Sequence, residues 1–201
     1  MTFVYIYRVV SDTGFAPCVD KGILSLACCK GGQIRRGKPI NTGLRYWIGS
    51  KRLGIDYKKH DVYIVGLYRN NFLYLARVTH VLSMKEYYQT TSKGRLDDIY
   101  SYIDGRLVRN HNLWDEGVHI DEAQNIRDIA GEYVLLSDDF IYLGKDAKES
   151  EMVREYAPPF RGCRLYEGEI AEKIVNECKK HCDGRVHKPN TPIRRSSCSC
   201  K

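Results

Sequence analysis

A chain of 201 residues and 23.2 kDa is long enough for one domain with a hydrophobic core of its own. Its hydrophobic content of 43% is that of a globular protein, and it has neither an apolar run of membrane-spanning length nor the start of a secretory signal, so we expect a cytoplasmic protein. The net charge of +7 and the pI near 8.9 favour an anionic partner, which we expect to be a nucleotide, DNA or RNA.

The first quarter of the chain contains strand patterns separated by glycine-rich turns. Residues 3–10 are β-branched and aromatic, which predicts a strand buried on both faces, and residues 23–29 predict a second strand. Residues 30–39 contain three glycines and a proline, which predicts a flexible loop. Its cations, Lys30, Arg35, Arg36 and Lys38, suit phosphate or carboxylate oxygens, and the alternative is a solvated loop of like charges.

A third strand is predicted at residues 45–49, followed by Ser50 and Lys51. The Gly-Ser-Lys turn can present amides and a hydroxyl to an anion, but it lacks the full P-loop pattern and therefore does not indicate an NTPase. Residues 62–69 and 72–82 predict a hairpin around Asn70 and Asn71. Ser83 and Glu86 form a capping box for a short helix, and residues 97–109 predict a second hairpin at Asp104-Gly105.

The second half of the chain predicts more helix. Helices are expected at 119–130, ended by Gly131, at 147–156, and at 167–182, where Ile170, Ile174 and Cys178 form the buried stripe. Residues 133–143 predict a strand interrupted at 137–139; its adjacent acids Asp138 and Asp139 suit a base, a metal ligand pair or a bulge. Residues 185–201 have the composition of a disordered basic tail.

These elements predict a single α+β domain over residues 1–184. At its centre we expect a curled, mostly antiparallel sheet or a small open barrel, with peripheral helices. Trp114 is expected either in the core or in the wall of a pocket.

The eight cysteines are expected to be reduced thiols. No pair of CxxC knuckles is present, so we predict no metal site and assign no cofactor. The alternative is a structural zinc site, for which the best ligands are Cys178, Cys182 and His187, with Cys163 as a fourth.

Several segments resemble a known family, the second of the nucleotide-modification-associated domains. They are the runs Asp12-Thr13-Gly14-Phe15-Ala16-Pro17, Leu26-Ala27-Cys28-Cys29-Lys30, Ile34-Arg35-Arg36, Gly49-Ser50-Lys51, Arg77-Val78-Thr79, Glu86-Tyr87-Tyr88, Asp98-Ile99-Tyr100 and residues 134–144. The Arg-Val-Thr run also resembles the wider class of PUA-like domains, including ASCH and EVE domains, which bind RNA or modified bases.

The resemblance implies a bacterial or phage protein that acts in nucleotide or DNA base modification. This sequence departs from the family pattern at Gly31-Gly32-Gln33, which lengthens the segment before Ile34, and at Lys21 in the first loop. Those differences affect the expected shape of the basic loop.

One hypothesis is an enzyme that acts on a nucleotide or a DNA base. Cys29 is then the candidate nucleophile, because the cations that follow it would stabilise a thiolate; the alternative is a buried strand thiol. Asp12 or Asp138 is the candidate general base, and Tyr100 or Tyr142 the orienting donor. A histidine could complete a dyad in space, the candidates being His80, His111 and His119.

A second hypothesis is a non-catalytic reader that holds a base between aromatic side chains. A toxin or defence protein whose basic face binds RNA is a third. An exposed Cys29 near a carboxylate or an imidazole would favour chemistry, whereas an aromatic cage without titratable groups would favour reading. The residues predicted to contact the nucleotide or its phosphates are Lys30, Arg35, Arg36, Ser50, Lys51, Tyr100 and Tyr142.

Overall fold

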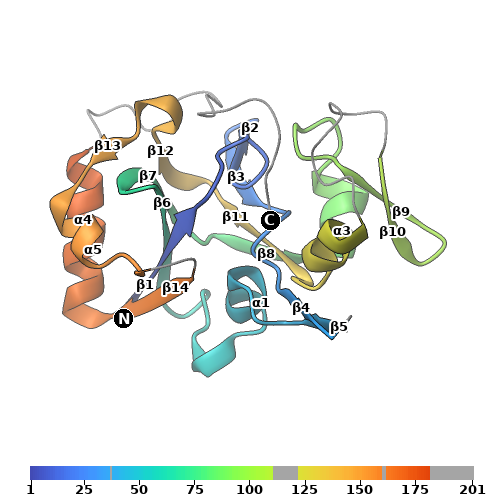
Figure 1. The fold of residues 1–201 in the computed structure, drawn as a ribbon, viewed down its shortest axis with the longest axis horizontal. Helices are drawn as coiled ribbons and strands as arrows, with labels where there is room; N and C mark the ends of the chain where they lie inside the picture. The colour runs from blue at the N-terminus through green and yellow to red at the C-terminus, as the bar shows by residue number, and fades with distance from the viewer. Residues whose placement is uncertain (37, 111–121, 160–161, 182–201) are drawn as a thin grey trace.

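The computed structural model describes residues 1–36, 38–110, 122–159 and 162–181 (Figure 1). Its larger sheet has the strand order β12-β7-β6-β1-β14, and the short β13 also pairs with β7. β1 runs parallel to β6, and the other pairs in this sheet are antiparallel. The strand bounds are β1 Thr2–Val9, β6 Asp61–Tyr68, β7 Asn71–Arg77, β12 Asp139–Tyr142, β13 Lys148–Glu149 and β14 Cys163–Glu167.

A second, antiparallel sheet has the order β2-β3-β11-β8, with bounds β2 Cys18–Asp20, β3 Ile23–Leu26, β11 Tyr133–Ser137 and β8 His80–Ser83. Two hairpins stand apart, β4 Gln33–Arg35 with β5 Lys38–Ile40, and β9 Tyr100–Ile103 with β10 Arg106–Arg109. The predicted α+β class with mostly antiparallel strands is confirmed. None of the sheets in the described residues closes into a barrel.

Helices flank the sheets (Figure 1). They are α1 Leu44–Gly49, α2 Met84–Glu86, α3 Glu122–Ile129, α4 Glu151–Glu155 and α5 Gly168–Lys180, with 3₁₀ turns at Arg52–Gly54 and Gly144–Asp146 and a π-helical turn at Tyr87–Thr91. No helix among the described residues is long and apolar enough to cross a membrane.

The core is arranged around β1, whose side chains are all buried except that of Arg8, which is partly buried. Because successive strand residues point to opposite faces, Tyr5 and Tyr7 pack into the larger cluster with the second sheet, whereas Val4 and Ile6 pack into a smaller cluster with α4 and α5. The prediction of a strand buried on both faces is therefore confirmed.

The predicted strand at residues 45–49 is wrong, because this segment forms α1. Leu44 and Ile48, one helical turn apart, are buried on the inner face of the helix, and the Arg45 side chain is fully buried beside them. The Arg45 guanidinium donates to the carbonyls of Ala27 and Asp128, which lie in two other segments of the chain. Those tertiary contacts outweigh the β propensity of Tyr46 and Trp47.

Other boundaries also differ from the sequence predictions. The β6–β7 turn lies at Arg69-Asn70, because a bulge at Gly66/Leu67 shifts the register so that Asn71 pairs with Tyr68. Residues 30–39 are expected to be a flexible loop, but residues 33–35 and 38–40 pair as the β4–β5 hairpin. β14 was missed because charged residues interrupt its pattern, and Ile170, expected in the buried stripe of α5, is 48% exposed.

The strand predicted at residues 133–143 is interrupted where expected. Ser137 ends β11 in the second sheet and Asp139 begins β12 in the larger one, so Asp138 is the residue at which the chain changes sheets. The capping box of Ser83 and Glu86 and the hairpin at Asp104-Gly105 are also present. The residues expected to form the tail, 185–201, lie outside the described residues, as does Trp114.

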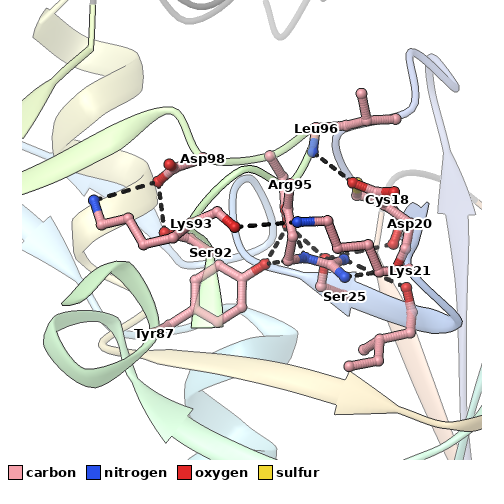
Figure 2. Close-up of polar contacts among 12 residues, drawn as sticks. Cys18, Asp20, Lys21, Ser25, Tyr87, Ser92, Lys93, Arg95, Leu96 and Asp98 are labelled. Carbon is pink, nitrogen blue, oxygen red and sulfur yellow. Dashed lines mark hydrogen bonds and ion pairs between the residues drawn. The ribbon is translucent and has the colours of Figure 1, made fainter. Parts of the chain in front are cut away.

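A buried polar network fixes residues 92–98 against β2 and β3 (Figure 2). Arg95 Nε donates to Asp97 Oδ1 at 3.1 Å and to Tyr87 Oη at 3.0 Å, and its Nη1 donates to the Asp20 carbonyl at 2.6 Å. The other Asp97 oxygen accepts from Ser25 Oγ at 2.5 Å and from Tyr87 Oη at 2.7 Å. Both charged side chains are almost fully buried, so each depends on the other for compensation.

Tyr88, the neighbour of Tyr87 in the chain, provides a control for the contribution of this network to stability. Among the described residues, the buried Tyr88 Oη has no hydrogen-bond partner. Tyr88→Phe is therefore expected to leave the free energy of unfolding unchanged or to raise it by up to about 1 kcal/mol, because no hydrogen bond is lost. Tyr87→Phe should lower it by about 1–3 kcal/mol, because buried partners are left unsatisfied. Urea unfolding of both variants measures the difference, and equal destabilisation would contradict it.

Candidate functional site

A pocket of about 450 Å³ lies where the chain leaves β1. Its wall combines the end of β1 and the following loop, the segment after β3, the start of α1, one face of α3 and the beginning of β14. The lining residues are Tyr7, Arg8, Val10, Ser11, Thr13, Phe15, Ala16, Cys29, Lys30, Gly32, Gln33, Thr42, Gly43, Leu44, Trp47, Gln124, Arg127, Asp128, Gly162 and Cys163. This volume falls within the range of about 300–1,000 Å³ typical of small-molecule sites.

The segment after β3 presents Cys29 and Lys30 to the pocket. β3 ends at Leu26, three residues earlier than predicted, and both Cys29 and Lys30 adopt left-handed backbone conformations, with φ of 55° and 51°. Such conformations are unfavourable for residues with a Cβ and are kept only where the surroundings hold them. Here the Lys30 carbonyl accepts from Arg45 N at 3.2 Å and lies so close to Gly43 that a Cβ at Gly43 would overlap it.

Asp128 of α3 holds this segment from the other side. Its Oδ1 accepts from Cys29 N at 2.6 Å and its Oδ2 accepts from Tyr100 Oη at 2.9 Å, while its main-chain carbonyl accepts from Arg45. Asp128 is almost fully buried and also lines the pocket. Sequence reasoning did not find this residue, because the contact with Cys29 joins positions 99 residues apart.

Tyr7 lies beside the Cys29 and Lys30 side chains. The Tyr7 and Tyr74 hydroxyls are hydrogen-bonded at 2.7 Å, and Lys30 Nζ lies 5.2 Å from the centre of the Tyr7 ring. Burial raises the pKa of Tyr7 far above its ordinary value, and the neighbouring Cys29 and Asp12 raise it further. Tyr7 therefore keeps its proton at neutral pH and can act as a hydrogen-bond donor.

Three cysteines lie at this wall. Cys29 and Cys163 line the pocket, and Cys28 lies behind Cys29. The Cys28 thiol is fully buried behind the wall, and a hydrogen bond to the Cys29 side chain, together with burial, raises the pKa of Cys28. Burial also raises the pKa of Cys163 to about 12. The Cys28 thiol donates its hydrogen to the Phe15 carbonyl at 3.5 Å, so it stays a neutral group behind Cys29.

Asp12 lies behind the pocket wall. It is fully buried, and its Oδ2 accepts from Tyr142 Oη at 2.8 Å. Burial raises the pKa of Tyr142, and the Asp12 carboxylate adds to this rise. The structure thus joins two of the predicted site residues, Asp12 and Tyr142, and joins Tyr100 to Asp128 instead of to either predicted base.

The remaining predicted residues do not line the pocket. Arg35 and Arg36 are exposed at the end of the β4–β5 hairpin. Ser50 Oγ donates to the Tyr46 carbonyl and Lys51 Nζ pairs with Asp56 at 2.8 Å, so both are bonded within their own loop. Asp138 is exposed, and its amide donates to Thr79 Oγ1. Of the three histidines, His80 is exposed beside Thr79, while His111 and His119 lie outside the described residues.

No cluster of three or more potential metal ligands occurs in the parts of the chain that the structure describes. Cys178 lies on the buried face of α5 and Cys163 in the pocket wall, while Cys182 and His187 fall outside the described ranges.

Together, fold and pocket define an α+β protein that presents a lysine, a thiol and aromatic rings to a pocket of small-molecule size. The chain belongs to the family described as nucleotide modification associated domain 2, which matches residues 1–191. This confirms the family resemblance seen in the sequence and supports a role in nucleotide modification; the wider PUA-like resemblance is not confirmed. Neither the curated proteins nor the solved structures give a significant match.

Proposed function

We propose that the pocket at the end of β1 binds a nucleotide, free or within a nucleic acid, and that the protein chemically modifies its base. The observation that carries this proposal is the placement of Cys29 and Lys30 side by side in the wall of a pocket of about 450 Å³, with Asp128 and Tyr7 beside them. A thiol with a neighbouring carboxylate and a hydrogen-bond donor is an arrangement that favours chemistry over simple binding.

Different side chains of the pocket wall suit different parts of a nucleotide. Phe15 and Trp47 supply apolar surface suited to the face of a base, and the Lys30 ammonium supplies a charge suited to a phosphate. Arg127 also lines the pocket, and Arg8 is held by the Pro158 carbonyl at 2.7 Å and by the Arg69 carbonyl. Three cationic side chains and one carboxylate, that of Asp128, thus line the pocket, and this excess of positive charge favours an anionic ligand.

In this proposal Cys29 is the nucleophile. Asp128 fixes its backbone, Cys28 remains a thiol behind it, and the Tyr7 hydroxyl, which keeps its own proton, can donate a hydrogen bond to the bound base. Cys29 and Asp12 each raise the pKa of Tyr7, which indicates that both lie near its hydroxyl. A reduced thiol fits the proposed cytoplasmic location.

Reading a modified base is the second candidate function. It is favoured by the aromatic lining of Tyr7, Phe15 and Trp47, which can hold a base without reacting with it. The two functions make different demands on Cys29, because a reader does not need its sulfur.

Nucleoside mass spectrometry separates them. DNA and RNA are prepared from cells that express the intact protein, Cys29→Ser or Lys30→Gln. A new nucleoside mass that appears with the intact protein and disappears with Cys29→Ser supports modification. No new mass, together with nucleotide binding that survives Cys29→Ser, would reject the enzyme in favour of the reader.

Cysteine alkylation tests the pocket directly. With a pKa of about 12, only about one Cys163 side chain in ten thousand is a thiolate at pH 8, so iodoacetamide should leave Cys163 largely unmodified. We expect Cys29 to be alkylated and a saturating nucleotide to protect it, as measured by peptide-resolved mass spectrometry. The Lys30→Gln variant should lose this protection. Alkylation of Cys29 at the same rate with and without nucleotide would contradict a nucleotide at this wall.

A further inference from the structure

The β4–β5 hairpin carries a second set of cations outside the pocket. Arg35, Arg36 and Lys38 are all exposed, and none forms an ion pair with another residue in the described ranges. Arg35 pairs with Lys38 across the hairpin, and Arg36 occupies the turn with a φ of 51°. The three charges are therefore gathered at one end of a short β ribbon.

Both ends of the hairpin are anchored in the pocket wall. Gln33, the first residue of β4, lines the pocket, and so do Thr42 and Gly43, which follow β5. Figure 1 shows β4 and β5 extending from the body of the protein beside α1 and below α3. The hairpin is thus a continuation of the wall, and its charged end points away from the pocket.

The separation between the two sets of cations decides what ligand can use both. Arg35 lies two strand residues beyond Gln33, which corresponds to about 7 Å at about 3.3 Å per residue. A nucleoside monophosphate whose phosphate lies at Lys30 inside the pocket has no second phosphate to place along this ribbon. A polynucleotide does, because it repeats its phosphates at intervals of a few ångström along the strand.

We propose that the substrate is an unpaired nucleotide within a single strand of DNA or RNA, whose backbone is held by Arg35, Arg36 and Lys38 while its base enters the pocket. The inference rests on the nucleotide pocket proposed above. Unpaired or extruded bases are the ones that can enter a pocket, and arginine and lysine contacts to neighbouring phosphates set the position of the strand.

The test compares strands with mononucleotides on the same proteins. Fluorescein-labelled single-stranded DNA and RNA oligonucleotides are titrated by anisotropy at several salt concentrations. Mononucleotides are titrated by quenching of Trp47 fluorescence in a Trp114→Phe background, which leaves Trp47 as the one indole of a chain that has 2 tryptophans. The hairpin variant is Arg35→Gln/Arg36→Gln/Lys38→Gln. Its matched control, Lys173→Gln/Lys179→Gln/Lys180→Gln, removes three exposed charges from α5, away from the hairpin (Figure 1).

We expect the hairpin variant to bind strands about 10- to 100-fold more weakly and to reduce the magnitude of the salt slope by about 2, since each lost phosphate contact contributes about 0.7. Its mononucleotide binding should match that of the parent protein, and the α5 control should keep its strand binding.

Three results would overturn the inference: unchanged strand affinity in the hairpin variant, an equal loss of strand affinity in the α5 control, or mononucleotides bound as tightly as strands. If mononucleotides do not bind the parent protein at all, the pocket proposal fails and this inference fails with it. Comparison of the DNA and RNA probes shows which backbone is preferred.

Discussion

Asp97→Ala is expected to lower the free energy of unfolding by about 3–5 kcal/mol, because it leaves the buried Arg95 guanidinium without its counter-charge. The same change removes the acceptor of two hydrogen bonds, those donated by the hydroxyls of Ser25 and Tyr87. For a chain of this length, such a loss corresponds to a fall in melting temperature of about 10 °C, which differential scanning calorimetry measures.

Two further variants make this test specific. Asp138→Ala removes an exposed carboxylate and is expected to change stability by no more than about 0.5 kcal/mol. Arg95→Met combined with Asp97→Leu removes both charges and should recover much of the loss, because a hydrophobic pair of similar volume replaces the ion pair. A loss below about 1 kcal/mol for Asp97→Ala would show that the network in Figure 2 contributes little to stability.

Asp128→Ala is expected to reduce nucleotide modification by about 100-fold or more, because Cys29 would lose the contact that fixes its left-handed backbone. In this account Asp128 is a positioning residue, acting through Cys29. The variant should therefore also slow alkylation of Cys29 and weaken its protection by nucleotide. Wild-type activity in Asp128→Ala would show that the position of Cys29 does not depend on this carboxylate.

Loss of stability needs to be separated from loss of positioning in this experiment. Asp128→Ala removes the acceptor of both the Cys29 amide and the Tyr100 hydroxyl, which keeps only Asn125 Oδ1 at 3.1 Å, at an expected stability cost of about 1–3 kcal/mol. Adding Tyr100→Phe removes that hydroxyl and should recover part of the stability. It should not recover activity. Asp128→Asn keeps an oxygen that can accept from the Cys29 amide, so its activity should lie between those of the parent and Asp128→Ala.

The elements that sequence predicts best here are those with a strong local pattern. The run from Phe3 to Val9 is apolar at every position except Arg8, and that pattern alone indicates a strand covered on both faces. Turn and capping chemistry at Asp104-Gly105 and at Ser83 is equally local, and both features are present. α1 shows the opposite case, because a fully buried arginine bonded to two distant carbonyls decides its conformation.

The same contrast between local sequence patterns and distant contacts applies to the candidate site. Cys29 and Lys30 could be identified from their neighbours in the chain, and both line the pocket. Asp128 and Tyr7 could not, since their role comes from contacts with residues far along the sequence. The glycines and cations of residues 30–39 indicated an anion-binding loop but not a β ribbon, because their strand propensity is low and the pairing of Gln33 with Ile40 depends on the adjacent wall.

The walls of the pocket come from segments spread between Tyr7 and Cys163, so the site exists only when most of the chain is folded. A ligand that fills it therefore binds the native state and not the unfolded chain, and thermodynamic linkage makes it a stabiliser of the whole domain. At a free concentration of one hundred times its dissociation constant, such a ligand adds about 2.7 kcal/mol to the free energy of unfolding. A thermal-shift screen of nucleotides and oligonucleotides can thus identify the ligand before any reaction is known.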